Sequence, residues 1–202
     1  MSFTDTILCS VALQPKTILV GLLGSICFMQ IRLAVEADLP AIIEIYNAAI
    51  PSRLATADLE PISVESRRAW FRSHGDRYPV WVIAIGSHDI QSDQNEQILG
   101  WLSLQMFYGR PAYHKTAEVS IYIDPKSQGK GIGKKLLGHA IAQCSKLNIS
   151  KLVGFIFAHN AASRRLFENF GFTEWGFLPE VAELDGQEQS LVIFGKIIGK
   201  DE

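Results

Sequence analysis

The sequence feature that most constrains this chain is a strand, a turn and a helix joined by three closely spaced glycines. From Ser120 to Leu137 the chain reads SIYIDPKSQGKGIGKKLL. An apolar strand ends at Ile123, an Asp-Pro pair turns the chain, and the glycines lead directly into a helix. Glycine tolerates positive φ and lets the backbone approach a ligand closely. The segment therefore predicts a tight connection that either binds a ligand through its backbone or only turns the chain.

The start of that helix is suited to binding a phosphate. The N–H groups of a first helical turn have no partner within the helix, and the helix dipole makes this end positive. Lys130, Lys134 and Lys135 add positive charge beside it. The spacing matches neither the Walker loop, which needs G-x-x-x-x-G-K-[S/T], nor the G-x-G-x-x-G dinucleotide fingerprint. If this loop binds phosphate, it belongs to a class of phosphate-binding loop other than these two.

The hydrophobic pattern predicts an α/β (α+β) chain with a mixed central sheet of about seven strands flanked by about four helices. Strands are expected at Ile31–Val35, Val80–Ile85, Ile98–Met106, Ala117–Ile123, Lys151–Phe157, Phe172–Val181 and Ser190–Ile197. Helices are expected after the cap Asp38 and at Ser63–His74, Gly131–Leu147 and Ala161–Phe170. Polar residues 92–97 predict a turn, and Asp185-Gly186 predicts a two-residue hairpin turn.

Composition excludes several classes of function. The 202 residues suit one globular domain, and 48% hydrophobic with 20% charged residues excludes a disordered chain. Lys plus Arg total 19 against 21 Asp plus Glu, which argues against a nucleic-acid binder because phosphate backbones need a cationic face. The cysteines Cys9, Cys27 and Cys144 show no CxxC pairing, and the histidines show no metal-ligand spacing. We expect no disulfide framework, no metal and a location in the reducing cytoplasm.

The first 28 residues differ from the rest of the chain. The stretch from Thr17 to Met29 carries no charge and is too short to span a bilayer, where a helix needs about 20 apolar residues. No small-x-small cleavage site follows it cleanly, as a signal peptide would require. Residues 1–28 are therefore interpreted as an apolar leader that is dispensable or stems from a misassigned start. A peripheral anchor or a packed extra segment are the alternatives, membrane contact is not expected, and residues 29–202 should form a single domain.

A further pattern in the glycine segment resembles a known family. Gln128-Gly129-Lys130-Gly131-Ile132-Gly133 fits Q/R-x-x-G-x-G/A, and in this the sequence resembles the GNAT N-acetyltransferases. The segment from Asn160 to Phe172 is similar to the family's second element, N-x-x-A/S followed by G-F, and the order of elements from Ile31 to Ile197 also agrees. The resemblance implies the GNAT fold, with acetyl-CoA as co-substrate and its pyrophosphate on this loop.

Three other stretches resemble the phosphinothricin acetyltransferase group within that superfamily. They are Ile31-Arg32 to Ile45-Tyr46-Asn47, Leu59-Glu60-Pro61 to Trp70-Phe71, and Thr116 to Ile123. This likeness implies transfer of the acetyl group to the primary amine of a small amino-acid analogue such as phosphinothricin or methionine sulfoximine. It also implies a homodimer. Two alternatives stay open: acetylation of protein N-terminal amines, and a non-catalytic sensor that only binds acetyl-CoA.

Glu118 is the candidate general base. Strand alternation places it on the same face as Ser120 and Tyr122, opposite the apolar residues of that strand. A carboxylate near the proposed cofactor loop can take a proton from an attacking ammonium, directly or through water. The group resemblance places the catalytic glutamate at this position. A solvated or ion-paired strand glutamate is the alternative.

The same resemblance implies contacts to the cofactor and to the acceptor. The residues implied to hold acetyl-CoA are Ile121, Tyr122, Ile123, Gln128, Gly129, Lys130, Gly131, Ile132, Gly133, Lys134 and Asn160. Asn160 is also a candidate helix N-cap. The residues implied to contact the acceptor, together with Glu118, are Tyr108, Gly109 and Arg110. Arg110 is suited to pair with a substrate carboxylate, and an exposed loop arginine is the alternative.

Two departures from the group concern the substrate. Some members carry a histidine in the last helix where this chain has Phe167, so a mechanism that needs this second base is in doubt. The hairpin turn Asp185-Gly186 is followed by Gln-Glu-Gln, without the group's usual aromatic residue. The sequence therefore defines the reaction type better than it defines the acceptor.

Overall fold

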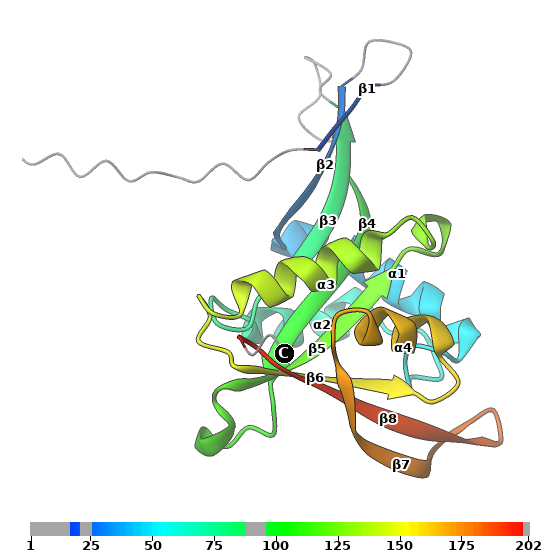
Figure 1. Cartoon of the computed structure of the whole chain (residues 1–202). Helices are drawn as coiled ribbons and strands as arrows, with labels where there is room; N and C mark the ends of the chain where they lie inside the picture. The colour runs from blue at the N-terminus through cyan, green and yellow to red at the C-terminus, as the bar shows by residue number, and fades with distance from the viewer. Residues whose placement is uncertain (1–16, 21–25, 88–95, 200–202) are drawn as a thin grey trace, which may run out of the picture.

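The computed structural model describes residues 17–20, 26–87 and 96–199. In these ranges eight strands form one sheet in the order β1-β2-β3-β4-β5-β6-β8-β7 (Figure 1). Neighbouring strands are antiparallel except β5 and β6, which run parallel, so the predicted mixed sheet is confirmed. The strands are β1 Thr17–Val20, β2 Ile26–Leu33, β3 Val80–Ser87, β4 Gln97–Met106, β5 Thr116–Ile123, β6 Lys151–Phe157, β7 Thr173–Leu184 and β8 Gln187–Ile197.

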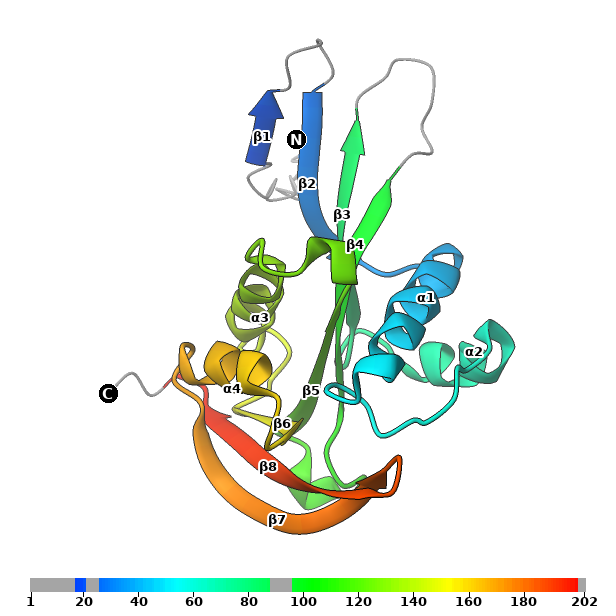
Figure 2. The same cartoon turned by 90° about the vertical axis from the view of Figure 1, so that its right-hand side faces the viewer.

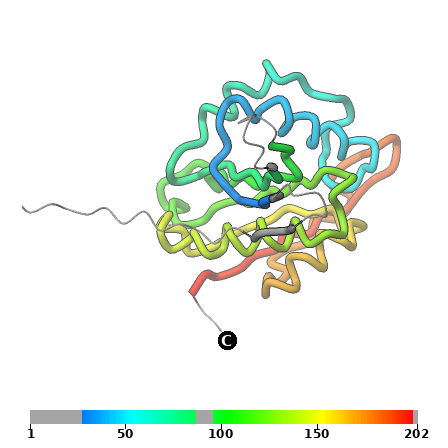
Figure 3. The backbone as a smooth tube through the Cα atoms, turned by 90° about the horizontal axis from the view of Figure 1, so that it is seen from above, coloured from blue at the N-terminus to red at the C-terminus, as the bar shows by residue number. Residues whose placement is uncertain are grey.

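Four α-helices in the described residues cover the two faces of this sheet. They are α1 Leu39–Ala49, α2 Val64–Ser73, α3 Ile132–Gln143 and α4 Ala161–Glu168. Helices α1 and α2 lie on one face, and α3 and α4 lie on the other (Figures 2 and 3).

Helix α2 begins at a capping serine. The Ser63 hydroxyl accepts a hydrogen bond from the Ser66 N–H at 3.2 Å, which satisfies one of the free donors at the start of α2.

Two apolar clusters fill the space between the sheet and its helices. The larger cluster joins α3 and α4 to the sheet and includes the fully buried Leu104, Leu137 and Leu152. The smaller one joins α1 to the other face, where the Trp101 indole N–H donates to the Ile42 carbonyl at 3.0 Å. Because the central strands are packed on both faces, they provide a rigid support for side chains at their edges.

The predicted elements are confirmed in order and type, but some ends are shifted. The strand expected from Ile31 begins at Ile26, because β2 pairs with β3 from Cys27 onward. The helix expected to reach Leu147 ends as an α-helix at Gln143, and the chain then turns toward β6. Such shifts arise because strand pairing and tertiary packing, which set the ends, are absent from a local pattern.

The Asp185-Gly186 hairpin turn is confirmed and explains why its strands are longer than expected. Both residues have positive φ, +52° and +77°, as a two-residue type I′ turn requires. Pairing therefore begins immediately at Leu184 and Gln187. The resulting hairpin curves along one end of the molecule (Figure 2).

Part of the predicted leader is described as strand. Strand β1 pairs with β2 from Thr17–Met29 to Val20–Ile26. Residues 1–16, with Cys9, and residues 21–25 lie outside the described residues, as do residues 92–95 of the expected polar turn. Whether the domain needs residues 1–28 stays a prediction. In the part of the chain that is described, no helix combines the length and apolar character needed to cross a bilayer.

Candidate active site

The parallel strands β5 and β6 pair only near their starts and then separate. Their register runs from Thr116–Lys151 to Glu118–Val153, while each strand stays paired with its other neighbour. The gap holds a cavity of about 450 Å³, lined by both strands, by α4 and by the loop that follows α1. Backbone N–H and C=O groups along such separated edges need partners when they are buried. The cleft is therefore suited to an extended ligand that hydrogen-bonds to β5 as a strand would.

Glu118 lies at the closed end of this cleft, in the last residue pair that joins β5 to β6. Its side chain is half-buried and lines the cavity. Burial raises the pKa of the Glu118 carboxyl, and a hydrogen bond with Gln105, its cross-strand neighbour on β4, acts in the opposite direction. A carboxylate with a raised pKa is a stronger proton acceptor than an exposed one. The position therefore suits a general base.

The face of the sheet that carries Glu118 continues as a row of cross-strand pairs. Ser103 lies opposite Ser120, and Trp101 lies opposite Tyr122, with the two rings stacked at 4.7 Å between centroids. A second cavity of about 160 Å³ lies over this row, against α1 and α2. Residues that line both cavities are Tyr46, Arg67, Ser120 and Tyr122. The site thus joins a strand cleft to a small aromatic pocket.

A five-residue segment after α1, Leu54–Asp58, forms another wall of the larger cavity, and we call it the strap. The Tyr46 hydroxyl donates to Asp58 Oδ2 at 2.6 Å. The Tyr122 hydroxyl donates to the Ala55 carbonyl at 3.1 Å. Two tyrosines whose rings line the site therefore also hold the strap in place through their hydroxyl groups.

The glycine loop follows β5 and leads into α3, as predicted. Gly129 and Gly131 have φ of +72° and +76°, and Gly131 is the N-cap of the helix. A Cβ at either position would meet nothing within 4 Å, so backbone conformation and not space requires glycine there. Gly133 differs, because its Cβ would lie 3.1 Å from the Leu166 side chain of α4. The loop is exposed and leaves the first N–H groups of α3 available to an anion.

Asn160 begins α4 and lines the cleft. Its Oδ1 accepts from the Ser163 N–H at 3.0 Å, so the predicted N-cap is confirmed. Its Nδ2 donates to the Leu54 carbonyl at 2.9 Å, which holds one end of the strap. An amide group has two N–H donors and two lone pairs on its oxygen. The side chain therefore keeps capacity for a ligand in the cleft.

Comparison with known proteins agrees with this geometry. The sequence profile described as "Acetyltransferase (GNAT) family" matches residues 39–172. The chain belongs to this family. It is therefore a GNAT acetyltransferase, and the fold expected from the sequence is confirmed.

Relatives named for an activity include members of the group that the sequence resembles. YwnH of Bacillus subtilis (strain 168), described as a "Putative phosphinothricin acetyltransferase", is 46% identical over 168 residues, covering 83% of this chain and 98% of the relative. The L-methionine sulfoximine/L-methionine sulfone acetyltransferase of Salmonella typhimurium is 34% identical and covers 76% and 85%. A GNAT superfamily phosphinothricin acetyltransferase from Sinorhizobium meliloti, solved in complex with AcCoA, superposes with a TM-score of 0.75 at 27% identity, covering 85% and 89%.

The structure brings some of the predicted site residues of this acetyltransferase together and leaves others apart. Glu118, Ile121–Ile123 and Asn160 line one cavity. The glycine loop, Gln128–Lys134, lies at the start of α3 and outside that lining. Tyr108, Gly109 and Arg110 also lie outside it, in the exposed loop after β4, with the Tyr108 side chain 73% exposed. Their assignment to the acceptor stays a prediction.

Four polar residues of the site received no role from the sequence: Tyr46, Thr56, Asp58 and Arg67. The Arg67 guanidinium lies 3.3 Å from the Asp58 carboxylate and 5.6 Å from the centroid of the Tyr46 ring. Two of these residues stand in stretches that support the family resemblance. No sequence motif links α1, the strap and α2, so the sequence alone does not predict that the side chains of these elements meet in one site.

Phe167 occupies the position where the family resemblance implies a histidine in some members. Its ring is buried against Phe172 and Phe194 and lines the cleft. An apolar ring cannot exchange protons, so this position supplies no second base.

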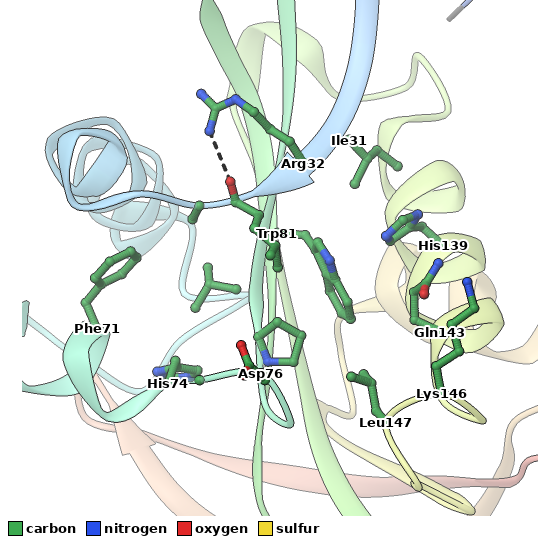
Figure 4. A pocket seen from close by; sticks show the side chains of 15 residues that line it. Ile31, Arg32, Phe71, His74, Asp76, Trp81, His139, Gln143, Lys146 and Leu147 are labelled. Carbon is green, nitrogen blue, oxygen red and sulfur yellow. Dashed lines mark hydrogen bonds between the residues drawn. The ribbon is translucent and has the colours of Figure 1, made fainter. Parts of the chain in front are cut away.

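A larger cavity, of about 530 Å³, lies elsewhere, between α2, α3 and the end of β2. Figure 4 shows His139 and Gln143 of α3 and Phe71 of α2 on either side of Trp81. None of the predicted site residues lines it. The smaller cleft between β5 and β6 is therefore our candidate active site. Among the residues the structure describes, no cluster of three or more histidine, cysteine or acidic side chains could hold a metal ion.

Proposed function

We propose that this enzyme transfers the acetyl group of acetyl-CoA to the primary amine of a small amino-acid-like acceptor of the phosphinothricin or methionine sulfoximine type. The observation that carries the proposal is Glu118, a half-buried carboxylate at the closed end of a strand cleft that adjoins an aromatic pocket. The activities for which the relatives are named support the class of acceptor.

The cleft and the glycine loop fit the two ends of acetyl-CoA. The pyrophosphate would be held by backbone N–H groups of Gln128–Lys134 at the start of α3, with lysine side chains nearby. The pantetheine arm would run along Ile121–Ile123, which line the gap where β6 has separated from β5. Asn160 would contact the same arm from α4. This arrangement directs the thioester toward Glu118.

In the reaction, Glu118 accepts a proton from the acceptor ammonium, directly or through one water molecule. The free amine attacks the thioester carbonyl, and a main-chain N–H group of the Ile121–Ile123 stretch helps to stabilise the charge that develops on its oxygen. The C–S bond then breaks, the nitrogen gives up its second proton, and the CoA thiolate takes up that proton and leaves as the thiol, so the acetyl group stays on the nitrogen as an amide. Because Glu118 is half-buried, its raised pKa favours the first step.

The acceptor would occupy the aromatic pocket next to Glu118. Its walls include Trp70, Trp101 and Ile43, with Arg67 as a cation. The walls also carry the polar groups of two serines and a glutamine, so the pocket suits a small side chain that bears polar oxygen atoms, as that of methionine sulfone does. Arg110, with Tyr108 and Gly109, remains our proposed partner for the acceptor carboxylate, because their loop follows the β4 residue that pairs with Ala117, next to Glu118.

A panel of amines tests the proposal. Purified protein is mixed with acetyl-CoA and, separately, L-methionine sulfone, L-methionine sulfoximine, phosphinothricin, common amino acids and a short peptide, and thiol release is followed. We expect turnover with the amino-acid analogues and an acetylated amine as product. Turnover confined to the peptide would favour acetylation of protein N-termini. Acetyl-CoA binding without turnover of any amine would favour a sensor and contradict the proposal.

We also propose that the enzyme works as a homodimer in the cytoplasm. Edge strand β7 exposes large apolar side chains, with Trp175, Phe177 and Val181 exposed by 45%, 51% and 56%. Apolar groups gathered on one strand of the surface suit contact with a second copy. The free, buried Cys144 suits a reducing compartment. Sedimentation of the parent protein and of a Phe177→Lys variant tests the dimer, which the charge should dissociate.

A further inference from the structure

The turn of the β7–β8 hairpin is bonded to the residue that precedes the strap. Arg53 Nε donates to Asp185 Oδ2 at 2.7 Å, and Arg53 Nη2 donates to Asp185 Oδ1 at 2.9 Å. Figures 2 and 3 show the tip of the hairpin near the loop that follows α1. Two parallel bonds between a guanidinium and a carboxylate fix orientation as well as distance. The hairpin turn thus sets where Arg53 lies.

Arg53 in turn organises the loop around it. It adopts a left-handed conformation with φ of +55°. Its Nη1 donates to the Leu59 carbonyl at 3.0 Å, across the base of the strap. Its own carbonyl lies 2.9 Å from Nε2 of His159, next to Asn160 at the start of α4. The side chain and the main chain of Arg53 are therefore both held, immediately before the strap begins.

The strap is held at both ends and, between them, by the bond from the Tyr122 hydroxyl to the Ala55 carbonyl. At its far end Asp58 is bonded to Tyr46, and at its near end Leu54 is bonded to Asn160 and follows Arg53. The Asp185 side chain is 63% exposed, and exposed ion pairs contribute little to global stability. Loss of the Asp185 carboxylate should consequently loosen the near end of the strap without unfolding the domain.

We propose that Asp185 is a positioning residue for acceptor binding. By clamping Arg53, it holds the strap as a preformed wall of the cavity that contains Glu118. A preformed wall lowers the cost of ordering the site when the acceptor binds. The inference rests on the proposed function, since it assigns that cavity to the transfer reaction. It also gives a role to Asp185 beyond the hairpin turn that the Asp-Gly pair predicts.

The substitution Asp185→Asn isolates the clamp. Asn-Gly forms the same type I′ turn as Asp-Gly, so the hairpin should stay intact while the charge is lost. Glu188→Gln removes a charge from an exposed residue of β8, close to the same turn, and serves as the matched control. With acetyl-CoA and L-methionine sulfone, we expect Asp185→Asn to raise the acceptor KM about three- to fivefold, the scale of an exposed two-pronged ion pair. The kcat, the acetyl-CoA KM and the Tm should stay near those of the parent and of Glu188→Gln.

A double-variant cycle tests whether Asp185 acts through Arg53. Arg53→Gln should raise the acceptor KM more than Asp185→Asn, because it also loses the bond to Leu59. Adding Asp185→Asn to Arg53→Gln should then change nothing further. An unchanged acceptor KM in Asp185→Asn, an equal change in the acetyl-CoA KM, or a full additional effect in the Arg53→Gln background would each overturn the inference.

Hydrogen exchange separates failure of this inference from failure of the proposed function. In the protein without substrates, amides of the strap should exchange faster in Asp185→Asn than in the parent or in Glu188→Gln, while those of β5 should not change. Unchanged exchange in the strap refutes the clamp, whether or not the enzyme acetylates anything. Faster exchange in a protein that turns over no amine refutes the proposed function and leaves the clamp supported.

Discussion

Replacing Glu118 by glutamine tests the proposed chemistry most directly. Glutamine has almost the same shape and can keep a hydrogen bond to Gln105, but it cannot accept a proton at neutral pH. A positioned general base contributes roughly 100- to 10,000-fold to rate. Because the Glu118 side chain is only half-buried, water can partly replace it. We therefore expect kcat to fall by about 100-fold, near the lower end of that range.

The pH dependence supplies the second part of this assay. Burial raises the pKa of Glu118 above its ordinary 4.5, so the parent's kcat/KM should gain activity as pH rises through that raised value. In Glu118→Gln this step should vanish, and activity should return only at high pH, where more of the amine is neutral. Acetyl-CoA affinity, measured by calorimetry, should barely change, because the proposed cofactor contacts are backbone groups of Gly129–Lys134.

A variant as fast as the parent at pH 7 would refute the role of Glu118. Tyr122 would be a poor replacement, because its hydroxyl donates to the Ala55 carbonyl and its pKa is raised by burial. A phenol with a raised pKa holds its proton more firmly and is a poor base at neutral pH. That outcome would therefore point to a chain of water molecules leading out of the cleft.

Three further predictions follow from other parts of the molecule. Gly131→Val should abolish acetyl-CoA binding in a folded protein, because a β-branched residue is strained at φ of +76°, and unchanged affinity by calorimetry would contradict the assignment of the loop. A chain that starts at Met29 should keep its activity, since the cleft is built from later elements, and aggregation or loss of turnover would show that the removed residues pack on the domain. Asp38→Asn should lower the Tm at pH 7, because the ionised Asp38 carboxylate stabilises the fold. Burial alone would raise the pKa of Asp38, but hydrogen bonds from Arg32 and from the Val35 N–H hold this pKa below its usual value. The stabilisation is lost as pH falls through that lowered pKa, so the difference in Tm between parent and variant should shrink below about pH 4.

The features that sequence reasoning found correctly are encoded within a few residues. The hydroxyl of Ser63 bonds to an N–H three residues ahead, and the Asp185-Gly186 turn is set by the φ angles of its own residues. Gly131 likewise marks a helix start through its own conformation. Such short-range chemistry is visible in a linear pattern. This short-range chemistry was enough to predict the succession of strands and helices along the chain and the position of the glycine loop before α3.

The walls of the site were not predictable in this way. Leu54 and Asn160 are 106 residues apart in the chain, and Arg53 and Asp185 are 132 apart. The sequence indicates a helix cap at Asn160 and a hairpin turn at Asp185, but nothing in it connects these residues to Leu54 or Arg53. Only the packed fold brings them together, because the hairpin and α4 approach the loop after α1 through tertiary contacts. A family resemblance can indicate that such a stretch matters, but it does not say what the stretch touches.

Gly154 and Phe167 pack together at the point where β5 and β6 separate, and this packing helps to shape the cleft. Gly154 directly follows Val153, the last residue of β6 that pairs with β5. A Cβ at Gly154 would overlap the ring of Phe167, so glycine lets α4 pack directly on the strand where the separation begins. The same ring lines the cavity. Phe167 therefore shapes the cleft by packing, so the site can lack a second base at this position and still keep the geometry that places Glu118 at its closed end.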